Sequence, residues 1–171
     1  MREVARFEKI SYGQFEKDYK EQYPSMKSAE IKDIYDKIVL PARATKSSAG
    51  YDFYSPISFT LKPNETIKIL SGIKCFILDN WMLSLYPKSG LGFKFRLQLN
   101  NTVGIIDADY YNNINNEGHI QFKLTNASNE NKVVEINSGA GFAQGVFLEY
   151  GVVIGDVANK ERVGGFGSTS K

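Results

Sequence analysis

The hydrophobic pattern of the chain changes character near residue 38. Before that point, aromatic residues recur at the spacing of one helix face, at Tyr12, Phe15, Tyr19 and Tyr23. Ser11 and Gln14 have the spacing of a capping box, and Pro24 ends the pattern. A second short helix is indicated by apolar positions at Ile31, Ile34, Tyr35 and Ile38. We predict that residues 1–37 are a helical extension packed on the main body or on a neighbouring subunit.

From residue 38 onward the pattern is typical of β-structure. Short apolar or alternating runs lie at about 38–42, 50–54, 57–61, 66–70, 73–78, 81–86, 95–100, 103–106, 119–125, 132–136 and 142–154. Gly, Pro, Asn and Asp separate them, which favours many short strands joined by turns. This spacing predicts an all-β fold, a sandwich or jelly roll, over residues 38–155. Residues 156–171 are Gly-rich and are predicted to be a flexible C-terminal arm.

Composition narrows the classes of function. A chain of 171 residues is most simply one folded body with terminal extensions. A net charge of +2 without a long basic run argues against nucleic acid or an anionic membrane as partners. One Cys and one His exclude a disulfide framework and a directly ligated zinc, so acid–base chemistry falls mainly to carboxylates. We expect a cytoplasmic protein, because no signal-peptide or membrane-spanning pattern is present.

The stretch from Asn101 to Tyr110 is the most informative candidate for chemistry. An apolar run, Val103 to Ile106, ends in a turn that carries Asp107, Asp109 and Tyr110. Asp107 is the first candidate for a general base, because an aspartate of ordinary pKa, about 3.9, is ionised at neutral pH. The alternative is a strand-ending turn in which the two carboxylates only bond nearby amides.

The C-terminal tail also has two interpretations. Its glycines offer backbone N–H groups to phosphate, while Arg162, Ser168 and Thr169 add donors and Phe166 offers a ring to stack on a base. Taken alone, the tail is more typical of a frayed terminus.

Five segments together resemble the trimeric deoxyuridine triphosphate nucleotidohydrolases, the dUTPases. They are Ala44–Ser55, Pro87–Gly92, Asn101–Tyr110, Gly139–Gln144 and Arg162–Thr169, in the order and at roughly the spacing of that family. The resemblance covers residues 38–171. It implies a jelly-roll (β-clip) subunit and a homotrimer whose sites draw on all three chains. It also implies Mg²⁺-dependent cleavage of the small-molecule substrate dUTP to dUMP and pyrophosphate, which keeps uracil out of DNA and supplies dUMP for thymidylate synthesis.

Carried over position by position, the resemblance assigns roles to individual residues. Asp107 would orient and deprotonate the attacking water, and Gln144 would help to position it. Asp52 would hold Mg²⁺ through water. Tyr110 would pack on the deoxyribose and leave no room for a 2′-hydroxyl.

The remaining family positions are substrate-binding. The uracil edge would be read by a hairpin formed by Asn101, Gly104, Ile105 and Ile106. The phosphate chain would be bound by Lys88, Ser89 and Gly90. The closing arm would comprise Arg162, Phe166, Gly167, Ser168 and Thr169, with Phe166 over the uracil.

The chain departs from the family pattern in four places. Lys88 stands where the family usually has Arg, and Gly141 stands where it commonly has another Arg, so a phosphate-binding cation is missing. Lys46, Lys94 and Arg96 are candidates to replace it. The interval from Arg162 to Phe166 is one residue shorter than in many relatives. Residues 111–117 lengthen the turn after Tyr110, for a reason that the sequence does not give.

Other interpretations stay open at this point. The segments at Asp52 and Ser89 also suit ordinary turns, and Gln144 also suits a structural buried amide. His119 is expected on the surface, and Cys75 in the core. The functional alternatives are a dCTP deaminase of the same fold, which would release ammonia, and a non-catalytic nucleotide-sensing trimer, suggested by residues 1–37 and by Gly141.

Overall fold

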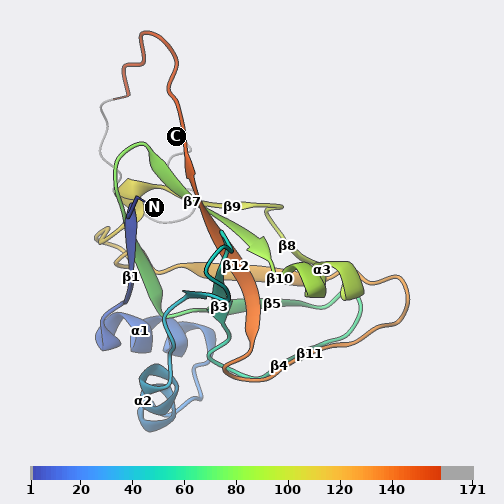
Figure 1. Cartoon of the computed structure of the whole chain (residues 1–171). Helices are drawn as coiled ribbons and strands as arrows, with labels where there is room; N and C mark the ends of the chain where they lie inside the picture. The colour runs from blue at the N-terminus through green and yellow to red at the C-terminus, as the bar shows by residue number, and fades with distance from the viewer. Residues whose placement is uncertain (1, 159–171) are drawn as a thin grey trace.

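The computed structural model describes residues 2–158 (Figure 1). Three helices are present in this part of the chain: α1 (Tyr12–Gln22), α2 (Ser28–Asp36) and α3 (Ser89–Phe95). The strands are β1 (Ala5–Lys9), β2 (Ala42–Arg43), β3 (Tyr51–Tyr54), β4 (Phe59–Leu61), β5 (Thr66–Leu70), β6 (Ile73–Ile77), β7 (Trp81–Pro87), β8 (Leu97–Leu99), β9 (Gly104–Ile106), β10 (Gln121–Asn126), β11 (Val134–Ile136) and β12 (Gly141–Glu149). A single 3₁₀ turn, η1 (Ala108–Tyr110), follows β9.

The N-terminal segment contains both predicted helices, and a strand precedes them. Ser11 caps α1, because its Oγ accepts a hydrogen bond of 3.2 Å from the Gln14 N–H. Phe15 and Tyr19 are fully buried on one face of α1, as the aromatic spacing predicted. Strand β1 pairs antiparallel with β6, from Ala5 opposite Ile77 to Lys9 opposite Ile73. The segment therefore joins the β-body through main-chain pairing as well as through helix packing. Figure 1 shows α1 and α2 together at the lower end of the molecule.

Four antiparallel sheets build the β-body, which confirms the all-β class. The largest has the order β2-β3-β12-β7-β9, and a second has the order β5-β10-β8. Two-stranded pairs β11-β4 and β1-β6 complete the arrangement. Neighbours in these sheets are mostly distant in sequence, as in a jelly roll.

The core fills the space between the sheets with aromatic and aliphatic side chains. The Phe122 ring meets the rings of Phe53 and Phe142 edge-on, with centroids 5.1 Å and 4.9 Å away. Cys75 is 1% exposed, as predicted for a core residue, and burial raises the pKa of its thiol to about 12.

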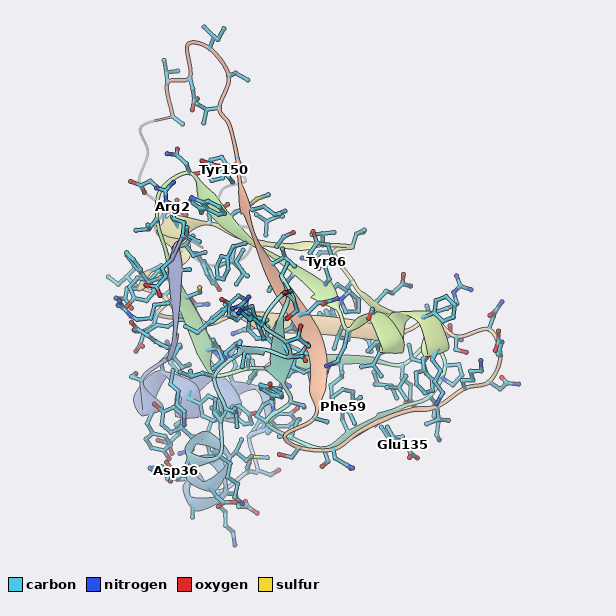
Figure 2. All side chains as sticks on the ribbon, viewed as in Figure 1. Arg2, Asp36, Phe59, Tyr86, Glu135 and Tyr150 are labelled. Atoms are coloured by element: carbon cyan, nitrogen blue, oxygen red, sulfur yellow. The ribbon has the colours of Figure 1, made fainter. Side chains whose placement is uncertain are left out.

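After β12 the chain leaves the sheet and extends away from the body. In Figure 2, Tyr150 lies where this departure begins. Val152, Val153, Ile154 and Val157 are at least 69% exposed, a run of aliphatic surface beyond the sheet. The pattern predicted one strand over 142–154, whereas β12 ends at Glu149.

Two other expectations differ from the structure. The run 95–100 was expected to be a strand, but α3 occupies Ser89–Phe95 and only Leu97–Leu99 is extended. The expectation that His119 is a surface residue is wrong: it is 0% exposed. The boundaries 1–37, 38–155 and 156–171 stay a prediction.

Candidate active site

Asp107 lies at the turn that ends β9. It caps η1 in an extended conformation, and its carbonyl accepts a hydrogen bond of 3.1 Å from the Tyr110 N–H. Asp107 is half-buried and Asp109 is exposed. A partly desolvated carboxylate at the end of an edge strand is well placed to meet a ligand outside the sheet.

Tyr110 turns inward from this loop. Only 2% of the residue is exposed, and its hydroxyl donates to the His119 carbonyl at 2.9 Å and accepts from Nδ2 of Asn116 at 2.9 Å. The ring therefore has a fixed pose within the described chain. A sugar can reach no more than a small part of it in that pose.

A cavity of about 460 Å³ opens beside the hairpin that the sequence assigned to uracil. Its apolar lining comes from Leu85, Leu99 and Phe122. Amide side chains and two lysines supply the polar lining, at Asn100, Asn101, Gln121, Lys68 and Lys123. A volume of this order, with a few polar groups over an apolar lining, suits a small planar ligand.

Gly104 lets the hairpin lie close to β7. A Cβ at this position would lie 3.1 Å from Cβ of Leu85, the residue opposite it in the β7–β9 register. A larger residue would push the two strands apart and change the shape of the cavity.

A second cluster joins three of the sequence motifs. Asp52 on β3 lies opposite Gln144 on β12, which in turn lies opposite Tyr86 on β7. The ammonium of Lys88 forms an ion pair of 2.6 Å with Oδ2 of Asp52. Nε2 of Gln144 donates to the Pro87 carbonyl at 3.3 Å. Residues predicted to hold Mg²⁺ and phosphate are thus gathered at one end of the largest sheet.

Gly141 belongs to the same cluster. A Cβ built on it would lie 3.2 Å from Nζ of Lys88 and 3.8 Å from Cβ of Asp52. The Lys88 ammonium therefore occupies space next to Gly141 that a side chain would otherwise enter. The sequence analysis named Lys46, Lys94 and Arg96 as replacements for the cation missing at Gly141. In the structure, the side chain that lies beside Gly141 is that of Lys88.

Ser89 and Gly90 are the first two residues of α3, and both are exposed. Apart from its own helix and chain neighbours, no atom of residues 2–158 lies within 4 Å of the position of a Cβ on Gly90. Their backbone N–H groups belong to the first turn of a helix, where such groups have no intrahelical acceptor. They are open to an anion beside Lys88.

The structure does not bring Asp107 to this phosphate-side cluster. Ile106, the last residue of β9, lies opposite Leu83 on β7, and Asp107 follows it. Lys88 follows Leu83 by five residues, which at about 3.3 Å per residue is a separation of about 17 Å along the strand direction. The residues predicted for catalysis and for phosphate binding therefore lie toward opposite ends of β7.

Some predicted residues fall elsewhere, and some lining residues were missed. Arg162, Phe166, Gly167, Ser168 and Thr169 lie outside the described residues. Lys68, Gln121 and Lys123 line the cavity without having been singled out. They reach it only because β5 and β10 pair, Lys68 opposite Lys123, and no local motif signals that pairing.

The potential metal ligands are sparse. Among residues 2–158, no group of three or more His, Cys, Asp or Glu side chains is placed to hold a metal ion. Asp52 offers a single carboxylate beside the exposed start of α3. Such a site fits Mg²⁺ that arrives on a triphosphate and keeps much of its water, and does not fit an all-protein cage.

Comparisons with known proteins identify the family and support the fold. The dUTPase family model matches residues 36–170. The deoxyuridine 5′-triphosphate nucleotidohydrolase of Lactococcus lactis is 40% identical over 134 residues, covering 77% of this chain and 88% of the relative. That of Nautilia profundicola is 34% identical over 147 residues, covering 83% and 98%. The crystal structure of dUTPase from Streptococcus mutans superimposes with a TM-score of 0.65 at 30% identity, covering 87% of this chain and 98% of that one.

The chain belongs to the dUTPase family. The fold class and the family inferred from the five motifs are both confirmed. The names of the relatives favour the hydrolase over the deaminase. None of the helices in the described part of the chain is long and apolar enough to cross a membrane.

Proposed function

We propose that this chain hydrolyses dUTP to dUMP and pyrophosphate as a homotrimer, with Asp107 as the general base. The observation that supports the proposal is the separation along β7 of two groups of residues, one at Asp107 and one at Lys88, which we interpret as two half-sites. Each half carries the residue types that one part of this reaction requires, and the relatives are named for this activity. Neither half is sufficient within one chain.

The base half is the cavity beside β9. The side chain of Asn101 and the backbone of Gly104, Ile105 and Ile106 would pair with the polar edge of uracil. Cytosine reverses donor and acceptor at ring positions 3 and 4 and would leave buried polar groups unpaired there, a mismatch that can reach about 10⁴-fold in discrimination. Tyr110 would limit the space at C2′ of the sugar.

The phosphate half is the cluster at the Pro87 end of β7. Lys88, together with the N–H groups of Ser89 and Gly90, would contact the phosphate oxygens, on which charge accumulates during attack at phosphorus. Gln144 would position water or phosphate through its amide. The residues 162–169, which include Arg162 and Phe166, are proposed to close over the nucleotide.

Asp52 would hold Mg²⁺ through bound water, and Mg²⁺ would supply charge neutralisation for the triphosphate. The ion pair with Lys88 uses Oδ2 of Asp52, one of its two carboxylate oxygens. The Lys88 ammonium keeps this carboxylate oriented. Binding of a triphosphate would give the ammonium a second group of anionic oxygens.

In the chemical step, the carboxylate of Asp107 would orient a water molecule and take its proton. The water oxygen would bond to the α-phosphorus while the bond from that phosphorus to the bridging oxygen breaks. Pyrophosphate would leave, and dUMP would stay bound until the site opens. Positioning and fixed charge supply most of the rate enhancement in reactions of this kind.

Assembly would unite the half-sites. A closed symmetric trimer can place the Asp107 end of one subunit against the Lys88 end of the next. The aliphatic run at Val152–Val157 supports this arrangement, because exposed apolar surface of that extent is typical of interfaces.

The deciding experiment is a pyrophosphate-release assay on a panel of nucleotides, with and without Mg²⁺, alongside sedimentation analysis. We expect release from dUTP, little from dTTP, dCTP or UTP, and the mass of a trimer. Ammonia release from dCTP would replace this proposal with the deaminase. Tight dUTP binding without pyrophosphate release would replace it with the nucleotide-sensing trimer.

A further inference from the structure

The segment after Tyr110, which lengthens the turn relative to the family, closes back onto that residue. Nδ2 of Asn116 donates to the Tyr110 hydroxyl at 2.9 Å, and the same hydroxyl donates to the His119 carbonyl at 2.9 Å. The hydroxyl is therefore both acceptor and donor, toward two residues that lie just after it in the chain. Because the ring is 2% exposed, these bonds form away from water and hold their geometry.

A second asparagine locks the loop from inside. Nδ2 of Asn113 donates to the Tyr110 carbonyl at 2.8 Å and to Oδ1 of Asn116 at 2.8 Å. Oδ1 of Asn113 accepts from the N–H groups of Asn115 and Asn116, at 3.1 Å and 3.2 Å. Asn113 is 7% exposed, and both its Nδ2 and its Oδ1 form hydrogen bonds. The loop is therefore an ordered support for Tyr110.

Gly118 lets the loop return this closely. It has a φ of +81°, and a Cβ there would lie 2.6 Å from the Tyr110 carbonyl oxygen. Both the conformation and the close approach require glycine. Its N–H donates to Oδ1 of Asn116 at 3.1 Å, so Asn116 connects the return of the loop to the Tyr110 hydroxyl.

The N-terminal segment holds the loop from outside. The carboxylate of Glu117 accepts from the N–H and the hydroxyl of Ser11, at 2.9 Å and 2.5 Å. The Tyr111 hydroxyl donates to Glu8 at 2.8 Å. Hydrogen bonds thus join residues 1–37 to residues 111–117. The sequence analysis assigned no function to either segment.

His119 completes the attachment in the interior. Its Nε2 accepts from the Gly72 N–H at 2.8 Å, so the ring proton is on Nδ1, which faces Oδ2 of Asp18 at 2.5 Å. The carbonyl of the same residue accepts from Tyr110. His119 thus links helix α1 to Tyr110, since its ring bonds Asp18 and its backbone carbonyl bonds the Tyr110 hydroxyl.

We propose that Asn116 is a positioning residue for Tyr110. It belongs to a brace that holds Tyr110 and the Asp107 turn and so supports discrimination between dUTP and UTP. The brace consists of Ser11, Asp18, Asn113, Asn116, Glu117 and His119. The proposal rests on the function assigned to Tyr110 and Asp107 above. The backbone bond from the Tyr110 N–H to the Asp107 carbonyl, 3.1 Å long, transmits the pose of Tyr110 to the turn.

Asn116→Ala removes the donor to the Tyr110 hydroxyl and the acceptor for Gly118 and Asn113. The ring then gains freedom near the position of C2′. We expect the ratio of kcat/KM for dUTP to that for UTP to fall about tenfold, the effect of losing roughly one net hydrogen bond. Asn115→Ala is the matched control, because Asn115 is an exposed neighbour in the same loop whose described hydrogen bond is made by its backbone.

Two further measurements separate positioning from general loss of structure. Tyr110→Phe breaks the same hydrogen bond from the other side, so its effect on the ratio should not add to that of Asn116→Ala in a double variant. Amide hydrogen exchange over residues 105–110 should be faster in Asn116→Ala than in Asn115→Ala, with or without nucleotide.

The inference is overturned if Asn116→Ala keeps the wild-type ratio, or if the effects of Asn116→Ala and Tyr110→Phe simply add. If Asn116→Ala does not fold, Tyr110→Phe alone tests the inference. An unchanged ratio of kcat/KM for dUTP to that for UTP in Tyr110→Phe would also overturn it. Failure of the proposed function is a different result: the wild-type chain would release no pyrophosphate from dUTP. The exchange rates would then still test whether Asn116 holds the turn.

Discussion

The Nζ atom of Lys88 lies 3.2 Å from the point where Gly141 would carry a Cβ. Two departures from the family pattern, lysine for arginine at 88 and glycine for arginine at 141, therefore meet at one place. A small residue at 141 leaves room for the ammonium, which also pairs with Asp52 at 2.6 Å. In the proposed phosphate site, the Lys88 ammonium therefore lies beside the position where the family commonly has the second of these arginines.

This relationship predicts that positions 88 and 141 are coupled. Lys88→Ala should lower kcat/KM for dUTP by about tenfold or more, because a cation at the phosphates is lost. Gly141→Arg alone should also lower it, since the new side chain must displace Lys88. Steady-state kinetics of the double variant Lys88→Ala/Gly141→Arg should show partial recovery relative to Lys88→Ala. Strictly additive losses would show that the two positions act independently.

Asp107→Asn tests the general base. The amide keeps the shape of the carboxylate but cannot accept the proton, so kcat for dUTP should fall by about 10²–10⁴-fold. Nucleotide binding, measured by calorimetry with a non-hydrolysable dUTP analogue, should change little. Asp109→Asn is the control, as a neighbouring exposed carboxylate on the same turn. A larger loss in the Asp109 variant would move the base assignment to that residue.

Mixed trimers test whether the half-sites come from different chains. Asp107→Asn and Lys88→Ala subunits should each be nearly inactive alone. Refolded together at equal amounts, they should regain about a quarter of the wild-type sites, because some neighbouring pairs then join an intact Asp107 to an intact Lys88. Mixtures without any regain would show that each site is built within one chain.

We predict that the contribution of Glu117 to the free energy of unfolding depends on pH. Burial raises the pKa of its carboxyl, but hydrogen bonds from Ser11 and the charge of Lys74 outweigh burial, so the pKa lies below its ordinary value of 4.5. A group with a lowered folded pKa stabilises the protein above the unfolded pKa and loses that contribution as pH falls through the folded pKa.

Glu117→Gln should therefore lower the free energy of unfolding at pH 7, by about 1 kcal/mol or less because the carboxylate is partly exposed. The difference from wild type should shrink below about pH 4. Urea unfolding at both pH values measures it, with Glu135→Gln, an exposed position on β11, as the control. An equal difference at both pH values would contradict the charge-based explanation.

We predict that the Cys75 thiol does not react with alkylating reagents in the folded protein. Burial raises its pKa to about 12, so the thiolate is scarce at pH 8 and the sulfur is covered. Iodoacetamide should label it only in denaturant, as followed by intact mass. Rapid labelling of native protein would show that strands β1 and β6 open readily.

The sequence by itself determined the β class, the aromatic face of α1 and the family, because alternation, helical spacing and motif order are local properties. Only the tertiary structure placed His119 in the interior, paired β1 with β6 and set Glu117 against Ser11, which are 106 positions apart. It also separated Asp107 from Lys88 along β7 through the register of β7 with β9. Such pairings depend on main-chain hydrogen bonds and buried polar contacts between distant segments. The hydrophobic pattern of a sequence does not specify which residues of two distant strands lie opposite each other.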